Sequence, residues 1–117
     1  MATKQTAKGG QALTEISNAM VALHREHFGR GPGAAKTILD GDIVVCVLTD
    51  VYTQVEKTLI EAGQVEHVRE TRALHQTAIE EQYKRRVEEI TGRRVNAFLS
   101  VVHVDPDVSV ETFLLDP

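Results

Sequence analysis

Residues 64–91 form the longest part of the chain without glycine or proline. Val68, His75, Ile79, Tyr83 and Val87 recur there at intervals of four or seven residues, which place them on one stripe of an α-helix. A glycine follows directly and can end such a helix in the left-handed conformation. The sequence therefore predicts one amphipathic helix of about 25 residues, which needs a surface to pack against.

Two pairs of strand-like runs flank this helix, and a turn signal lies inside each pair. The dipeptide Asp40-Gly41 lies between two β-branched runs, and glycine accepts the positive φ of a tight hairpin turn. Residues 105–107 contain a proline, which fixes a turn between the second pair. The predicted strands are residues 37–39, 42–49, 95–104 and 108–115.

Two further helices complete the expected fold. Apolar residues recur at helical spacing over residues 13–28, and a glycine- and proline-rich segment ends that run. Thr53 can cap a short helix, with Glu56 in the capping-box position and Gly63 as its stop. The order α-β-β-α-α-β-β predicts an α+β fold, with a four-stranded, mostly antiparallel sheet from two hairpins and helices packed on one face.

In the strand at residues 43–48, the side chains that point to either face of the sheet are apolar. A strand of a sheet with one solvent-exposed face should instead alternate polar and apolar residues. Residues 101–104 are also largely apolar toward both faces. Loops or the first helix could cover the second face of the sheet. Alternatively, two subunits share a sheet face or edge, and we therefore predict a homodimer.

Composition excludes several classes of protein. The single cysteine excludes a disulfide scaffold, and no apolar run reaches the length of about 20 residues that spans a bilayer. The net charge of −4 disfavours a general nucleic-acid partner. We expect a cytoplasmic protein without a transmembrane segment, in which residues 1–11 are a flexible N-terminus and residues 12–117 form a single domain.

No motif for catalysis, a metal or a cofactor emerges. The glycine-rich residues 29–37 lack the glycine before Lys36 that a phosphate loop requires, and they lead from a helix into a strand. His24 and His27 lie three residues apart, but no further ligand is close to them in the sequence. Cys46 lies in an apolar strand without a base to activate it. We predict no catalytic residue, no metal site and no cofactor, and an enzyme is the weakest of three options.

Basic residues outside the helix ends are the candidate ligand-binding groups, because they could hold a small anion. Arg72 falls close to the apolar stripe, so its guanidinium needs a partner, either Glu56 or a ligand carboxylate. The predicted anion-binding residues are Arg30, Lys36, Lys57, Arg69 and Arg72.

Four segments of the chain stand out: residues 28–32 (Phe-Gly-Arg-Gly-Pro), 53–59 (Thr-Gln-Val-Glu-Lys-Thr-Leu), 68–72 (Val-Arg-Glu-Thr-Arg) and 91–95 (Thr-Gly-Arg-Arg-Val). Together they resemble a bacterial family of small proteins, the MpsC-like family, formerly a domain of unknown function. The resemblance spans about residues 12–116 and rests on the order and spacing of the segments. Its motif positions include Phe28, Gly29, Gly31, Pro32 and Glu56.

The resemblance implies an accessory role in a Na+-translocating membrane-potential-generating system, linked to bicarbonate or sodium. A chain without a membrane span cannot move ions alone, so we expect a non-enzymatic accessory or regulatory protein. It would be cytoplasmic, dimeric and held near the membrane by a transport-protein partner. The alternative from another class is a domain that senses or binds a small anion such as bicarbonate, phosphate or a nucleotide.

Overall fold

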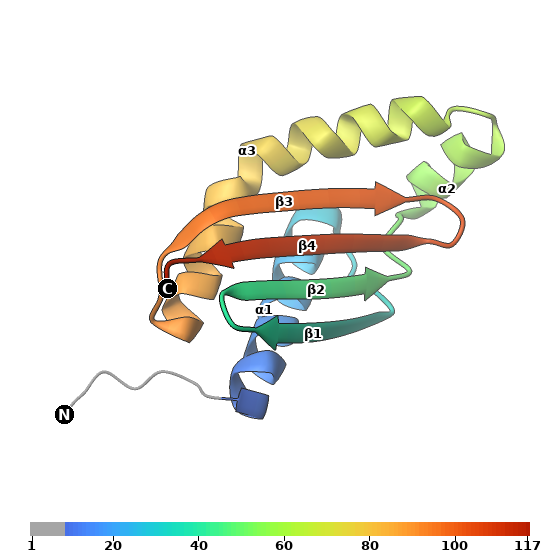
Figure 1. Ribbon diagram of the computed structural model, residues 1–117. Helices are drawn as coiled ribbons and strands as arrows, with labels where there is room; N and C mark the ends of the chain where they lie inside the picture. Colours follow the sequence, from blue (N-terminus) through green and yellow to red (C-terminus); the bar gives the residue numbers. More distant parts are fainter. Residues whose placement is uncertain (1–8) are drawn as a thin grey trace.

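The computed structural model describes residues 9–117, which fold into one four-stranded antiparallel sheet and three helices (Figure 1). The predicted fold class and element order are confirmed. The elements are α1 (Gly9–Phe28), β1 (Ala34–Asp40), β2 (Ile43–Thr49), α2 (Gln54–Glu61), α3 (Val65–Thr91), β3 (Val95–His103) and β4 (Val108–Leu115).

The two hairpins join side by side, so that the strand order is β1-β2-β4-β3. The first hairpin has Gly41 and Asp42 as its two loop residues, and Gly41 has the positive φ of 62° that the turn requires. Strand β1 begins at Ala34, three residues earlier than predicted, because Ala34, Ala35 and Lys36 continue the pairing with β2.

Both long helices pack against the same face of the sheet, α1 on β1 and β2 and α3 on β3, and they also contact each other. Figure 1 shows the sheet in front of these helices, with its other face toward the reader. Among residues 9–117, no helix is both long enough and apolar enough to cross a membrane.

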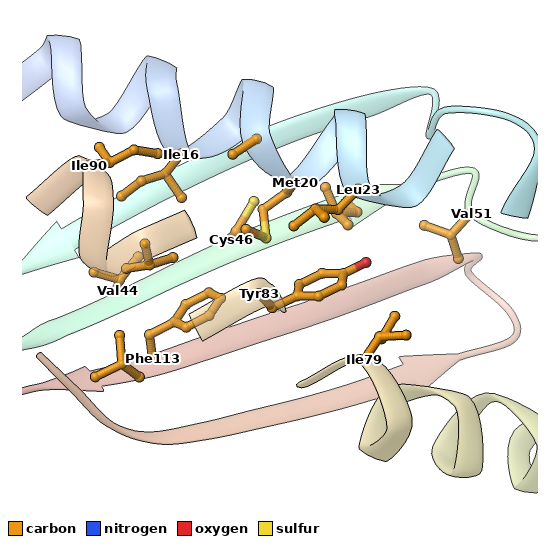
Figure 2. Close-up of a cluster of buried hydrophobic side chains, with 14 of the residues drawn as sticks. Ile16, Met20, Leu23, Val44, Cys46, Val51, Ile79, Tyr83, Ile90 and Phe113 are labelled. Carbon is orange, nitrogen blue, oxygen red and sulfur yellow. The ribbon is translucent and has the colours of Figure 1, made fainter. Parts of the chain in front are cut away.

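The core lies between the sheet and the two long helices (Figure 2). Residues of α1 and β2, among them Met20 and Cys46, belong to this core. Tyr83 of α3 stacks on Phe98 of β3, which in turn stacks on Phe113 of β4. Burial raises the pKa of the Cys46 thiol to about 11. Cys46 is a free and fully buried cysteine of this core.

The first helix begins at Gly9, so the flexible N-terminus expected for residues 1–11 overlaps its first turn. Residues 1–8 lie outside the described residues. Farther along the chain, Gly92 ends α3 in the left-handed conformation, as the sequence predicts.

Candidate functional site

Arg72 is the centre of a buried polar network between α3 and the segment that follows β2. Its side chain is only 7% exposed. Nε donates to Oε2 of Glu56 and Nη2 donates to Oε1, each over 2.6 Å, so the pair is bidentate. Nη2 also donates to the carbonyl oxygen of Val51 over 2.7 Å. The guanidinium lies 3.8 Å from the centre of the Phe28 ring, which supports it by a cation–π contact.

Local sequence places Glu56 for this pair. Thr53 caps α2 by accepting from the amide of Glu56, and Oε1 of Glu56 accepts from the amide of Thr53 over 2.8 Å. This is the predicted capping box, and it fixes the carboxylate that Arg72 then binds. Burial alone would raise the pKa of Glu56, but the hydrogen bonds from Arg72 and Thr53 outweigh it and hold that pKa below its usual value.

A second ion pair holds the end of β2 against the loop after α1. Nη2 of Arg30 lies 2.9 Å from Oδ2 of Asp50, and Nη1 donates to the carbonyl oxygen of Tyr52 over 2.8 Å. Nζ of Lys57 lies 3.4 Å from Oδ1 of the same aspartate. The hydrogen bond from Arg30 is the main reason why the pKa of Asp50 is lowered.

His24 joins the two ion pairs from the side of α1. Nδ1 lies 2.6 Å from the carbonyl oxygen of Arg30, and Nε2 lies 3.0 Å from that of Val51. A neutral imidazole can donate to only one of these oxygens. Burial lowers the pKa of His24, and the positive charges of Arg72 and Arg30 act in the same direction.

A pocket of about 210 Å³ opens beside this network, between α3 and the face of the sheet that the helices cover, which we call the inner face. Its walls combine apolar surface with polar groups from α3, β3 and β4. The carboxylate of Glu111 is 3% exposed, and its Oε1 has no hydrogen-bond partner among the described residues. Nε2 of Gln76 is also buried and, within residues 9–117, unpartnered. The lining residues include Phe28, Leu48, Arg69, Arg72, Ala73, Gln76, Tyr83, Ser100, Val102, Ser109 and Glu111.

The structure brings together three of the five predicted anion-binding residues. Arg30, Lys57 and Arg72 all surround residues 50–56, where each contacts a carboxylate. Arg69 lines the pocket and lies 3.7 Å from Glu66. Lys36 is on the opposite face of the sheet, because its neighbour Thr37 points inward and hydrogen-bonds with Ser17 of α1.

The motif positions of the resemblance have structural roles around the same network. Phe28 stacks on Arg72 and Glu56 binds it. Gly29, with a φ of 80°, ends α1, and Gly31 and Pro32 then lead the chain into β1. The partner expected for Arg72 was either Glu56 or a ligand carboxylate, and it is Glu56.

Sequence reasoning missed Asp50, Gln76 and Glu111. Asp50 carries no motif, since a lone aspartate after a strand is an ordinary loop residue. Glu111 did leave a signal, because it has the same strand parity as Ser109 and Phe113, which are both buried. A charged residue on the buried parity of a strand marks either a buried pair or a site.

The other face of the sheet is the second candidate surface. Five large apolar side chains are exposed there, and no helix of the described chain covers them (Figure 1). Only β1 contributes charged residues to this face, namely Lys36 and Asp40. We call it the outer sheet face. Its exposed large apolar residues are Ile38, Ile43, Leu99, Val101 and Leu114.

Comparison with protein families gives a match over nearly the whole chain. A family model described as "Na+-translocating membrane potential-generating system (MpsC)" matches residues 8–117. No curated protein and no solved structure matches the chain. Because the family model covers nearly all of the chain and agrees with the resemblance in the sequence, the chain belongs to the MpsC family.

Proposed function

We propose that the protein is a non-enzymatic accessory or regulatory protein of the cytoplasm that acts by contact on a membrane transport system. Family membership points to a Na+-translocating membrane potential-generating system. A link to bicarbonate is part of this proposal. The observation that carries a contact function is the outer sheet face, since an uncovered apolar patch of this kind is typical of a protein–protein interface.

We infer that a second copy of the chain covers this face. Strand register arranges it in rows across the sheet, and the central row is Ile38, Val45, Thr112 and Leu99. A two-fold axis along that row stacks two sheets face to face, with each β1 antiparallel to its counterpart. In that arrangement Lys36 lies opposite the partner subunit's Asp40. The only two charges of the face thus become complementary in a dimer.

The size of the face favours a reversible dimer. Four strands of about seven residues give a sheet of roughly 19 by 23 Å, or about 440 Å² per copy if the sheet is treated as flat, without the extra surface of its protruding side chains. A standard interface buries about 800 Å² per partner. A dimer with this small contact can dissociate, and a transport protein could then compete for the same face. Such competition is the regulatory step that we propose.

The test is the mass of the protein in solution, measured by light scattering and sedimentation from micromolar to millimolar concentration. Leu99→Lys places a charge in the central row of the outer sheet face, where the side chain is 57% exposed, and should produce a monomer. Leu74→Lys is the matched control, because Leu74 is 75% exposed on α3 and lies outside that face. A wild-type protein that stays monomeric over the whole range contradicts the dimer.

Contact with a transport protein needs a separate measurement. Tagged wild type and the Leu74→Lys control should retain an integral membrane transport protein from solubilised membranes of the native host. Leu99→Lys should no longer retain the transport protein, because the proposed contact with it uses the outer sheet face. Retention of the same transport protein by all three variants would place the contact elsewhere, and the absence of any such protein would count against the accessory role.

The alternative function, a small-anion sensor, has less support. Arg30 and Arg72 already bind Asp50 and Glu56, so an anion must compete with a carboxylate at each. A ligand that binds only the native state raises its thermal stability. A melting temperature that rises with added bicarbonate, phosphate or nucleotide, at constant ionic strength, would favour the sensor over the accessory protein.

A further inference from the structure

We propose that the pocket between α3 and the inner face of the sheet binds a small uncharged molecule with an apolar body and a hydroxyl head group. This site is separate from the outer sheet face, and the proposal does not depend on the dimer. The hydroxyl would meet the buried polar atoms of Glu111 and Gln76, and the apolar body would lie against the rings and aliphatic side chains that line the pocket.

Two unpartnered polar atoms define the head group. Oε1 of Glu111 is a buried acceptor, and Nε2 of Gln76 is a buried donor, and neither has a partner within residues 9–117. Buried polar groups are nearly always hydrogen-bonded, because an unmade bond is costly in an apolar environment. The other carboxylate oxygen, Oε2, already accepts from the hydroxyl of Ser109. These two atoms therefore offer one acceptor and one donor to whatever enters the pocket.

A hydroxyl matches this pair because the same oxygen donates one hydrogen bond and accepts others. It also suits either charge state of Glu111, since it can donate to a carboxylate or accept from a carboxylic acid. Burial raises the pKa of Glu111, although the nearby Ser100 and Ser109 hydroxyls and the charge of Arg72 oppose that shift. An anionic head group would lie against the buried carboxyl group of Glu111 and has no proton to donate to it.

A cationic head group is disfavoured by the arginines of the wall. Both Arg69 and Arg72 line the pocket, and a ligand cation would pass or face them. Arg72 is neutralised by Glu56, but Arg69 is close only to the more exposed Glu66, at 3.7 Å. A ligand cation thus meets a like charge in this pocket, and an anion has no proton to donate to the carboxylate form of Glu111, whereas an uncharged hydroxyl avoids both.

The remaining walls accept an apolar body about the size of one aromatic ring. Phe28, Leu48, Ala73 and Val102 line the pocket together with Tyr83. The volume is about 210 Å³. For comparison, an engineered apolar cavity of about 150 Å³ in another protein binds benzene. A ring with one short hydroxylated substituent therefore fits, and a larger ligand would have to extend through the open side.

The probe is benzyl alcohol, and its three matched analogues are toluene, benzylamine and benzoate. Each is titrated into the full-length 15N-labelled protein at neutral pH, and amide shifts are followed by NMR. We expect saturable shifts in Ala73, Ser100 and Val102, with benzyl alcohol binding at least about fivefold more tightly than toluene, which corresponds to one net hydrogen bond. Benzoate and benzylamine should bind more weakly than benzyl alcohol.

Two variants link the binding to the pocket. Gln76→Met keeps the length of the side chain but removes the donor, and it should weaken benzyl alcohol by about three- to tenfold while leaving toluene unchanged. Gln64→Met is the matched control, since Gln64 is exposed at the start of α3 and its side chain makes no capping hydrogen bond. Ala73→Leu fills the pocket from an exposed helix position and should abolish binding of both probes.

Several results would overturn the proposal. The absence of localised shifts up to the solubility limit would mean that water alone occupies the polar atoms. Tighter binding of benzoate or benzylamine than of benzyl alcohol would mean that the site selects a charge. Unchanged affinities in both Gln76→Met and Ala73→Leu would place the binding outside this pocket.

Discussion

Replacement of Arg72 by methionine is the sharpest test of the polar network. The variant keeps an unbranched, mostly apolar side chain, but it removes the guanidinium that neutralises Glu56 and lies over the Phe28 ring. Loss of one partner from a buried ion pair costs about 3–5 kcal/mol. Glu56 is 15% exposed and would keep its hydrogen bond from the Thr53 amide, so we expect the lower end, about 3 kcal/mol.

The matched control is Arg69→Met, one turn earlier on α3. Its side chain is 43% exposed and lies 3.7 Å from Glu66, and a surface pair of this kind contributes about 0–1 kcal/mol. The free energy of unfolding of both variants is measured by urea titration at pH 7. One protein concentration is used throughout, because dimerisation would make stability depend on concentration. The difference between them should be about 2–3 kcal/mol.

A double-mutant cycle isolates the pair itself. Glu56→Gln keeps an acceptor for the Thr53 amide, so it removes the charge but not the capping box. Combined with Arg72→Met, it should recover part of the loss, with a coupling energy of about 2 kcal/mol. If Arg72→Met is no more destabilising than Arg69→Met, or if the cycle shows no coupling, the network does not hold α3 to the end of β2.

Three further predictions concern single residues. Glu111→Gln should be more stable than wild type at pH 7 and should lose that advantage toward pH 4. The folded pKa of Glu111 is raised, so its carboxyl group stabilises the fold below its unfolded pKa of 4.5, and this stabilisation is lost as the pH rises through the folded pKa. Urea midpoints measured across pH 4–7 test this prediction, and a difference that does not change with pH would contradict it. The Cys46 thiol has a pKa of about 11, so it should not react with a thiol reagent at pH 8 in the native protein and should react fully in urea. Rapid labelling of Cys46 in the native protein would show that strand β2 opens. Thr53→Ala should cost about 1 kcal/mol in the same urea assay, through loss of the α2 cap, whereas no loss would mean that α2 is held by other contacts.

The sequence predicted the elements well because local signals specify them. The capping box at Thr53 and Glu56 and the glycine at residue 92 each act within a few residues, and each is found as predicted. The start of β1 was placed three residues too late, because Ala34 and Ala35 have no strand signal of their own and join the sheet only through pairing with β2.

The candidate site was predicted only in part. Arg72 stood out because a charged residue on an apolar helix stripe needs a partner, and Glu56 was one of the two alternatives. That Arg30 and Lys57 share Asp50 could not be read from the sequence, since these three residues come from different loops and helices. The pocket was not predicted at all, because it arises from the distance between α3 and the sheet.

Local signals along the chain specify the helices and strands, the α+β class and the excess of apolar residues in the strands, because periodicity, caps and turns act over short distances. That both long helices cover the same face of the sheet depends instead on how the elements pack together. This packing leaves Leu99 and Val101 exposed on the outer sheet face and buries Glu111 beneath α3. Packing of distant segments fixes both results, and no short stretch of sequence encodes it.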